Sequence, residues 1–138
     1  MTDNVRLVSY FYTHCADSPG EAFRLLSTLK EGGVNLIAFS AFPEGMNRCQ
    51  VDFIPENPDL FLKAAHKAGL TVSDQKQCFF INGADRTGAV AEVLKRLADA
   101  KINVTAIDAL CAGSGRYGAI VWVAPRDVTK AARTLGAS

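Results

Sequence analysis

The sequence lacks the features that mark several large classes of protein. None of its apolar runs approaches the ~20 residues that a membrane-spanning helix requires, and the N-terminal MTDNVRLV has no basic region followed by an apolar core. The 15 basic and 14 acidic residues balance to a net charge of +1, with no block of like charges and no basic helix face. These absences predict a soluble, unprocessed, cytoplasmic protein that binds neither membranes nor nucleic acid.

Metal-binding and redox motifs are missing as well. The four cysteines contain no Cys-x-x-Cys pair, and the two histidines are too few and too scattered for a metal site. Cys78 and Cys111 lie in apolar, strand-like runs, so we interpret the cysteines, Cys15 and Cys49 included, as reduced packing residues. His14 beside Cys15 lacks a third group to orient a thiol nucleophile. The sequence therefore predicts no catalysis, no metal and no cofactor.

What the sequence does contain is an internal repeat. CADSPGEAF at residues 15–23 and GADRTGAVA at residues 83–91 share the pattern Ala-Asp-x-x-Gly, and an offset of 68 residues aligns the two halves without a gap. Identical pairs at this offset include Asp17 and Asp85, Gly20 and Gly88, Leu26 and Leu94, Asn35 and Asn103, and Gly45 and Gly113. We interpret the chain as a duplication, with one module at residues 1–74 and a second at residues 75–138.

Each copy has the same predicted order of elements. Aromatic and β-branched runs at residues 5–12 and 78–82 predict first strands, and apolar stripes of helical spacing follow from residues 22 and 90. Second strands are expected at 36–42 and 104–111, and third strands at 48–54 and 116–123. A second helix is expected at 58–68, opened by Asn57 as its cap and Pro58 in its first turn, and at 126–135.

This order, with a fourth strand near Leu70–Val72, predicts an α+β fold of two ferredoxin-like βαββαβ modules, each an antiparallel sheet with its helices on one face. Only three residues follow the last helix, so the second module is expected to lack a full last strand and to leave an edge at residues 78–82. That edge is then covered by the first copy, by a second subunit, or not at all. The run 36–42 is apolar on both faces, which favours packing of the copies and a homodimer.

The repeated motif has two interpretations of similar weight. Ser18 and Glu21 have the spacing of a capping box, with Pro19 in the first turn of the helix. Gly20 and Gly88 lower helix propensity there, which indicates the close approach of another backbone or of a ligand. A helix N-terminus left open by glycine offers free N–H groups to a carboxylate. Neither of the glycine-rich phosphate-binding patterns is present.

These residues resemble the ACT domain, a small regulatory module of amino-acid metabolism. The resemblance rests on Asp-x-Pro-Gly at a helix start, followed by Gly-Val-Asn-Leu at 33–36 and Ile-Asn-Val at 102–104 before the next strands. It implies that the loop and the asparagine contact an amino acid between two modules. The implied ligand-binding residues are Asp17, Pro19, Gly20 and Asn35 in the first copy and Asp85, Gly88 and Asn103 in the second. Thr87 replaces the proline, which favours the first copy.

Alternatives remain open for several of these residues. Asn35 and Asn103 are equally well explained as turn residues in a left-handed conformation. Arg48 and Arg116 either hold a carboxylate or are surface charges at strand ends, the latter being favoured. Trp122 is expected in a core or an interface. We expect a non-catalytic sensor or regulatory protein that binds a small molecule; the alternative is a structural protein–protein interaction module without a ligand. The sequence does not indicate which enzyme would be regulated.

Overall fold

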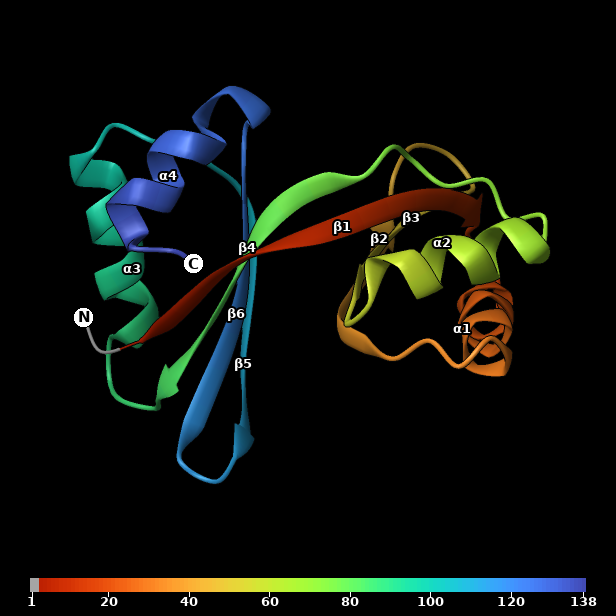
Figure 1. Ribbon diagram of the computed structural model, residues 1–138, viewed down its shortest axis with the longest axis horizontal. Helices are drawn as coiled ribbons and strands as arrows, with labels where there is room; N and C mark the ends of the chain where they lie inside the picture. The colour runs from red at the N-terminus through yellow and green to blue at the C-terminus, as the bar shows by residue number, and fades with distance from the viewer. Residues whose placement is uncertain (1–2) are drawn as a thin grey trace. The chain divides into compact units, whose positions relative to one another are not determined.

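The computed structural model describes residues 3–138, which fold into two compact units. The continuous unit is Ser9–Lys76. The split unit consists of the described residues through Val8 together with Gln77–Ser138. The described chain has an α+β fold with six antiparallel strands and four α-helices, as the sequence predicts (Figure 1).

The continuous unit packs two helices on one sheet face. Its elements are β1 (Asn4–Ala16, which begins in the split unit), α1 (Glu21–Glu31), β2 (Leu36–Pro43), β3 (Arg48–Pro55) and α2 (Pro58–Lys67), with β3 antiparallel to both β1 and β2. Phe11 of β1 stacks on Phe61 of α2 with ring centroids 4.7 Å apart, and Phe53 of β3 lies against Phe61. Leu25 and Leu29 of α1 join the same buried cluster, so both helices cover the same side of the sheet.

The fourth strand predicted at residues 70–72 is wrong, because these residues form no strand. They nevertheless run beside β1. The Ser73 N–H donates to the Tyr12 carbonyl over 2.8 Å, but the Tyr12 N–H donates to the Ser73 side-chain hydroxyl instead of a carbonyl. The Thr13 hydroxyl likewise donates to the Thr71 carbonyl over 2.7 Å. Side chains thus take the place of the backbone ladder that would define a strand.

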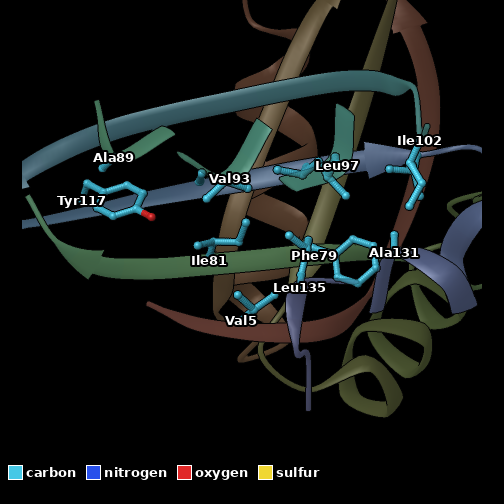
Figure 2. Close-up of a cluster of buried hydrophobic side chains, with 13 residues drawn as sticks. Val5, Phe79, Ile81, Ala89, Val93, Leu97, Ile102, Tyr117, Ala131 and Leu135 are labelled. Atoms are coloured by element: carbon cyan, nitrogen blue, oxygen red, sulfur yellow. The ribbon is translucent and has the colours of Figure 1, made fainter. Parts of the chain in front are cut away.

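The split unit has the same arrangement around a second core. It contains β4 (Lys76–Ala84), α3 (Ala89–Asp99), β5 (Val104–Gly113), β6 (Arg116–Val123), the 3-10 turn η1 (Pro125–Asp127) and α4 (Val128–Leu135), with β6 between β4 and β5. Helices α3 and α4 lie on the same side of this sheet (Figure 1). Figure 2 shows their buried side chains meeting those of the sheet in one cluster.

The missing last strand of this unit is replaced from the other end of the chain. Among the described residues no strand follows α4, and the sheet position beside β4 is taken by the first residues of β1. Val5 is 4% exposed and packs in the cluster with Phe79 and Ile81 (Figure 2). The Leu7 N–H donates to the Ser138 carbonyl and the Ser138 N–H to the Val5 carbonyl. The edge expected at residues 78–82 is therefore covered by this chain's own first strand.

The capping box predicted at Ser18 and Glu21 is wrong. Helix α1 begins at Glu21, its N-cap is Gly20 with φ +89°, and Ser18 contributes only its carbonyl, which accepts from the Glu21 N–H over 3.4 Å. Gly88 caps α3 with φ +81°. A Cβ on either glycine would meet nothing within 4 Å, so the positive φ, rather than a close neighbouring backbone, requires glycine.

Candidate functional site

The two motif loops have the same backbone geometry. The Asp17 N–H donates to the Asn47 carbonyl over 3.0 Å, and the Asp85 N–H donates to the Gly115 carbonyl over 2.8 Å. Donors and acceptors are both separated by the repeat offset. The bond ties each loop to the hairpin that leads into the third strand, and it leaves both aspartate side chains exposed.

A groove of about 270 Å³ lies at the second of these loops, within the split unit. It is bounded by the loop, the first turn of α3, the end of β5 and one residue of β6. Its lining residues are Asp85, Arg86, Gly88, Ala89, Val90, Ala91, Ala109, Leu110, Cys111 and Tyr117. The groove thus contains Asp85 and Gly88 of the predicted ligand-binding residues, and it does not contain Asn103.

One end of the groove is an open helix N-terminus. Gly88 provides no side-chain cap for α3, and the first helical backbone bond runs from the Glu92 N–H to the Gly88 carbonyl over 3.0 Å. The Val90 and Ala91 N–H groups precede that bond and therefore belong to the turn that has no intrahelical acceptor. With the positive end of the helix dipole, they form a place for a carboxylate.

Asp85 provides a negative charge beside that helix end. Its interaction with the Cys111 thiol, followed by burial, raises the pKa of Cys111. Cys111 is exposed, so the interpretation of this cysteine as a core residue is wrong. Cys111 lies near the end of β5 that leads into β6, where the residues of the strand are exposed. Cys78, in contrast, is buried as predicted.

Beneath the groove a buried carboxylate holds Arg86 and Tyr117 in place. The Asp3 side chain has no exposed surface, and the Arg86 guanidinium donates to both of its oxygens over 3.1 and 3.2 Å. The Tyr117 hydroxyl donates to Asp3 over 2.8 Å. Arg86 also donates to Glu92 of α3 and to the Ala84 carbonyl. We call Asp3, Arg86, Tyr117 and Glu92 the Asp3 cluster.

The charges of the Asp3 cluster shift its pKa values in a consistent way. Burial raises the pKa of Asp3, but the hydrogen bonds from Arg86 and Tyr117 outweigh it and hold the pKa below the ordinary aspartate value. Burial, and then the bond to Asp3, raise the pKa of Tyr117 to about 12. The bond from Arg86 lowers the pKa of Glu92. The cluster is therefore ionised in a fixed pattern at neutral pH, with Tyr117 neutral.

Gly83 makes room for this cluster. A Cβ built on Gly83 would overlap the Asp3 carboxylate and come within 3.2 Å of the Tyr117 ring. Gly83 lies directly opposite Tyr117 in the pairing of β4 with β6. A side chain at this position would exclude Asp3, so the absence of a Cβ here is a packing requirement.

The predicted asparagines lie far from the predicted loops. Helices α1 and α3 each have 11 residues, about 16 Å of helix, and they separate Gly20 from Asn35 and Gly88 from Asn103. The Asn35 amide donates to Glu56 over 3.0 Å. The left-handed interpretation of both asparagines is wrong, since Gly33 and Lys101 have the positive φ values. Within one unit, the loop and the asparagine do not meet around one small ligand.

Arg48 and Arg116 are surface charges. Arg48 donates to Glu44 over 2.6 Å, and Glu44 also contacts His14 over 3.1 Å. Arg116 donates to Asn82. Both arginines are exposed, in agreement with the favoured interpretation.

Sequence reasoning missed Arg86, Leu110 and Tyr117 as groove residues. Pairing the runs 104–111 and 116–123 as a hairpin places Cys111 opposite Tyr117 and Leu110 opposite Gly118, next to the motif loop. This hairpin pairing could have been predicted from the sequence. Asp3 has no such signal, because it reaches the cluster only when the N-terminal strand enters the split unit.

Within residues 3–138, no group of three or more His, Cys, Asp or Glu side chains is arranged to hold a metal ion. None of the helices described there is long and apolar enough to cross a membrane.

Solved structures that share this fold include regulatory proteins. No protein-family model and no curated protein matches the sequence. A crystal structure of a protein from Bacteroides thetaiotaomicron matches with a TM-score of 0.80 and 18% identity, covering 96% of this chain and 89% of that chain. The ligand-free regulatory subunit of aspartate kinase from Thermus thermophilus matches with a TM-score of 0.65 and 15% identity, covering 97% and 94%. The corresponding subunit from Thermus flavus matches with a TM-score of 0.62 and 17% identity, covering 99% and 95%. These likenesses show the fold.

Proposed function

We propose that this chain is a non-catalytic regulatory protein built from two ACT-like modules in tandem, and that it binds an amino acid in the groove of the split unit. The groove at the second motif loop is the observation that supports the proposal most strongly. The fold shared with two aspartate kinase regulatory subunits agrees with a regulatory role. The motif resemblance contributes the ligand class.

The groove offers complementary partners for both ends of an amino acid. The N–H groups at the start of α3 donate to the ligand carboxylate, and the Asp85 carboxylate accepts from its ammonium group. Val90 and Leu110 provide apolar surface for the side chain, and Leu110 is 66% exposed. The Asp3 cluster fixes Arg86 and Tyr117 below, so the groove is preorganised.

A homodimer completes the proposal. Strand β5 ends the sheet of the split unit, and in the described chain it pairs with β6 alone. An unpaired edge with an exposed leucine is a place where a second copy adds its own strand. Because Leu110 also lines the groove, ligand binding and dimerisation would be linked through the same strand, and each would stabilise the other by mass action.

The ligand is tested by thermal unfolding with each proteinogenic amino acid at millimolar concentration. We expect one of them to raise Tm in a dose-dependent way. The discriminating variants are Asp85→Asn and Asp17→Asn, which remove equivalent exposed carboxylates from the two loops. Loss of a charge-assisted contact weakens binding by about 10- to 100-fold, so Asp85→Asn should lose most of the shift and Asp17→Asn should keep it.

Other outcomes separate the alternatives. A Tm shift lost in Asp17→Asn and kept in Asp85→Asn places the ligand at the first loop and contradicts the groove. No shift with any amino acid contradicts ligand binding and favours the structural interaction module. The dimer is tested by light scattering. We expect the wild type to be a dimer and Leu110→Lys, which places a charge on the edge strand β5, to be a monomer.

A further inference from the structure

Two cysteines face each other across neighbouring strands of the continuous unit. The pairing of β1 with β3 places Cys15 directly opposite Cys49. The bond from the Asp17 N–H to the Asn47 carbonyl lies two residues further along the same pairing. Since hydrogen-bonded pairs recur at every second residue, Cys15 and Cys49 are such a pair, with Cα atoms about 5.5 Å apart. Most disulfides have a Cα separation of roughly 4.4–6.8 Å.

Both thiols point to the same side of the sheet. Cys15 continues the row of Phe11 and Thr13 along β1, and Cys49 continues the row of Phe53 and Val51 along β3. Both cysteines pack against the buried aromatic cluster beneath α1 and α2. Both are only partly buried, so a small oxidant reaches them. Side chains opposite one another on the same face have Cβ atoms about 4.5–5.5 Å apart, which leaves the two sulfur atoms within reach of each other.

The electrostatics of Cys15 agree with a contact between the two sulfur atoms. Burial is the largest cause that raises the pKa of Cys15, and the charge of Cys49 and a hydrogen bond with it act in the same direction. Glu21 of α1 raises this pKa further, whereas Arg24 lowers it. The raised pKa keeps the Cys15 thiol protonated at neutral pH, so its reaction with an oxidant accelerates as the pH rises.

We propose that Cys15 and Cys49 form a reversible disulfide when the protein meets a peroxide, so that this pair is a redox modification site of the continuous unit. One thiolate attacks a peroxide oxygen and becomes a sulfenic acid, with release of water. The second thiol then displaces the sulfenic oxygen as a second water, and the S–S bond forms. The two thiols lose two protons and two electrons, and hydrogen peroxide is reduced to two molecules of water.

The bond has a structural consequence because of its position. Cys15 lies two residues before Asp17, where β1 leads into the first motif loop, and Cys49 lies next to Arg48 at the start of β3. A disulfide fixes this end of β1 to β3 and restricts the loop that carries Asp17 and Gly20. The inference does not depend on the groove or on ligand binding, since those lie in the split unit.

The test is oxidation of the reduced full chain with hydrogen peroxide, followed by intact mass and by peptide mapping without reductant. The wild type should lose the mass of two hydrogen atoms, yield one peptide in which Cys15 is linked to Cys49, and return to its starting mass with dithiothreitol. Its Tm should rise by several degrees on oxidation, since the closed loop restricts the unfolded chain.

Matched variants decide the assignment. Cys111→Ser removes the exposed thiol and should behave as the wild type does. Cys15→Ser and Cys49→Ser should show neither the mass loss nor the linked peptide, with circular dichroism confirming that they are folded. The proposal is overturned if the mass loss persists in either variant, if peroxide only adds oxygen to the wild type, or if the linked peptide joins Cys111 of two molecules.

Discussion

The continuous and split units have different side chains at one equivalent pair of positions. Cys15 and Cys49 of the continuous unit correspond, at the repeat offset, to Gly83 and Tyr117 of the split unit, and each pair is opposed across two antiparallel strands. In the continuous unit the position holds two thiols. In the split unit it holds a glycine and a tyrosine, and the space above the glycine is filled by Asp3.

The difference shows which parts of a duplicated structure are fixed and which vary. The loop hydrogen bonds, the positive φ of Gly20 and Gly88 and the helix starts are the same in both units. These backbone features define the fold. The side chains behind the loop differ, and the split unit has an ionic cluster around the buried Asp3 carboxylate, with a groove above it. Substitutions in the Asp3 cluster should therefore cost more stability than matched substitutions in the continuous unit.

Asp3→Asn should have the largest effect. Asparagine keeps one acceptor oxygen but loses the charge, and its NH₂ group faces donors of Arg86 or Tyr117. We expect a loss of about 3 kcal/mol in the free energy of unfolding, the lower end for a broken buried pair because Arg86 keeps contact with solvent and with Glu92. Urea unfolding followed by the fluorescence of Trp122, the single tryptophan, reports on the split unit, where it lies in β6. Asp17→Asn, an exposed carboxylate, should change stability by less than ~0.5 kcal/mol.

Acid should remove the stabilisation that the Asp3 carboxylate provides. The folded pKa of Asp3 lies below its ordinary value of 3.8, so the stabilisation is present above that value and is lost as the pH falls through the lowered folded pKa. The stability difference between the wild type and Asp3→Asn should therefore shrink in acid. A difference that stays constant from neutral pH to pH 2 would show that Asp3 acts through its shape and not its charge.

Gly83→Ala comes next, with an expected loss of about 2 kcal/mol from overpacking against the Asp3 carboxylate. The matched substitution in the continuous unit is Cys15→Ala at the equivalent position, which should cost less than ~1 kcal/mol because a half-buried thiol leaves only a small void. In the double variant with Asp3→Asn the two effects should not add, since both act on one contact. If the two stability losses add fully, the strain caused by Gly83→Ala does not arise at the contact with Asp3.

Tyr117→Phe should lose about 1.5 kcal/mol, the value of a hydrogen bond to a charged acceptor. The folded pKa of about 12 exceeds the ordinary value of 10.0, so this stabilisation is present below pH 10 and is lost as the pH rises through about 12. Alkaline unfolding curves of the wild type and the variant should therefore converge. Tyr12→Phe in the continuous unit serves as the control and should leave stability almost unchanged.

Gly20→Ala and Gly88→Ala should have the smallest effect and should be alike. Each forces a Cβ into the left-handed region, at a cost of about 1 kcal/mol per residue. Equal losses, measured by urea unfolding, would confirm that the glycines are required by backbone geometry in both loops. A loss at Gly88 alone would indicate that only the second loop needs its observed conformation.

Local patterns predicted the elements of the fold well. The period of the apolar residues located the first helix of each repeat. The cap at Asn57, which located the second helix of the first copy, is confirmed, with its side chain accepting from the Leu60 N–H over 3.2 Å. The pattern failed where a backbone angle decides: Ser18 to Glu21 has the spacing of a capping box, yet the positive φ of Gly20 moves the helix start to Glu21.

The candidate site was harder to predict from the sequence, because contacts between residues far apart in the chain form it. Asp3 contacts residues 86 and 117 only once β1 has entered the split unit. The opposition of Cys15 and Cys49 depends on strand register, which a shift of one residue would destroy. The motif itself was found in both copies, but the groove beside the second copy is lined by side chains that the motif does not specify.

The central claim is that the second motif loop, and not the first, binds an amino acid. It is tested most directly by recording amide chemical shifts of the full chain during titration with each proteinogenic amino acid in turn. The expected shifts cluster at residues 85–91 and 109–111, with the amides of residues 17, 18, 20 and 21 unchanged. Shifts centred on residues 17–21, or none with any amino acid at millimolar concentration, would contradict the claim.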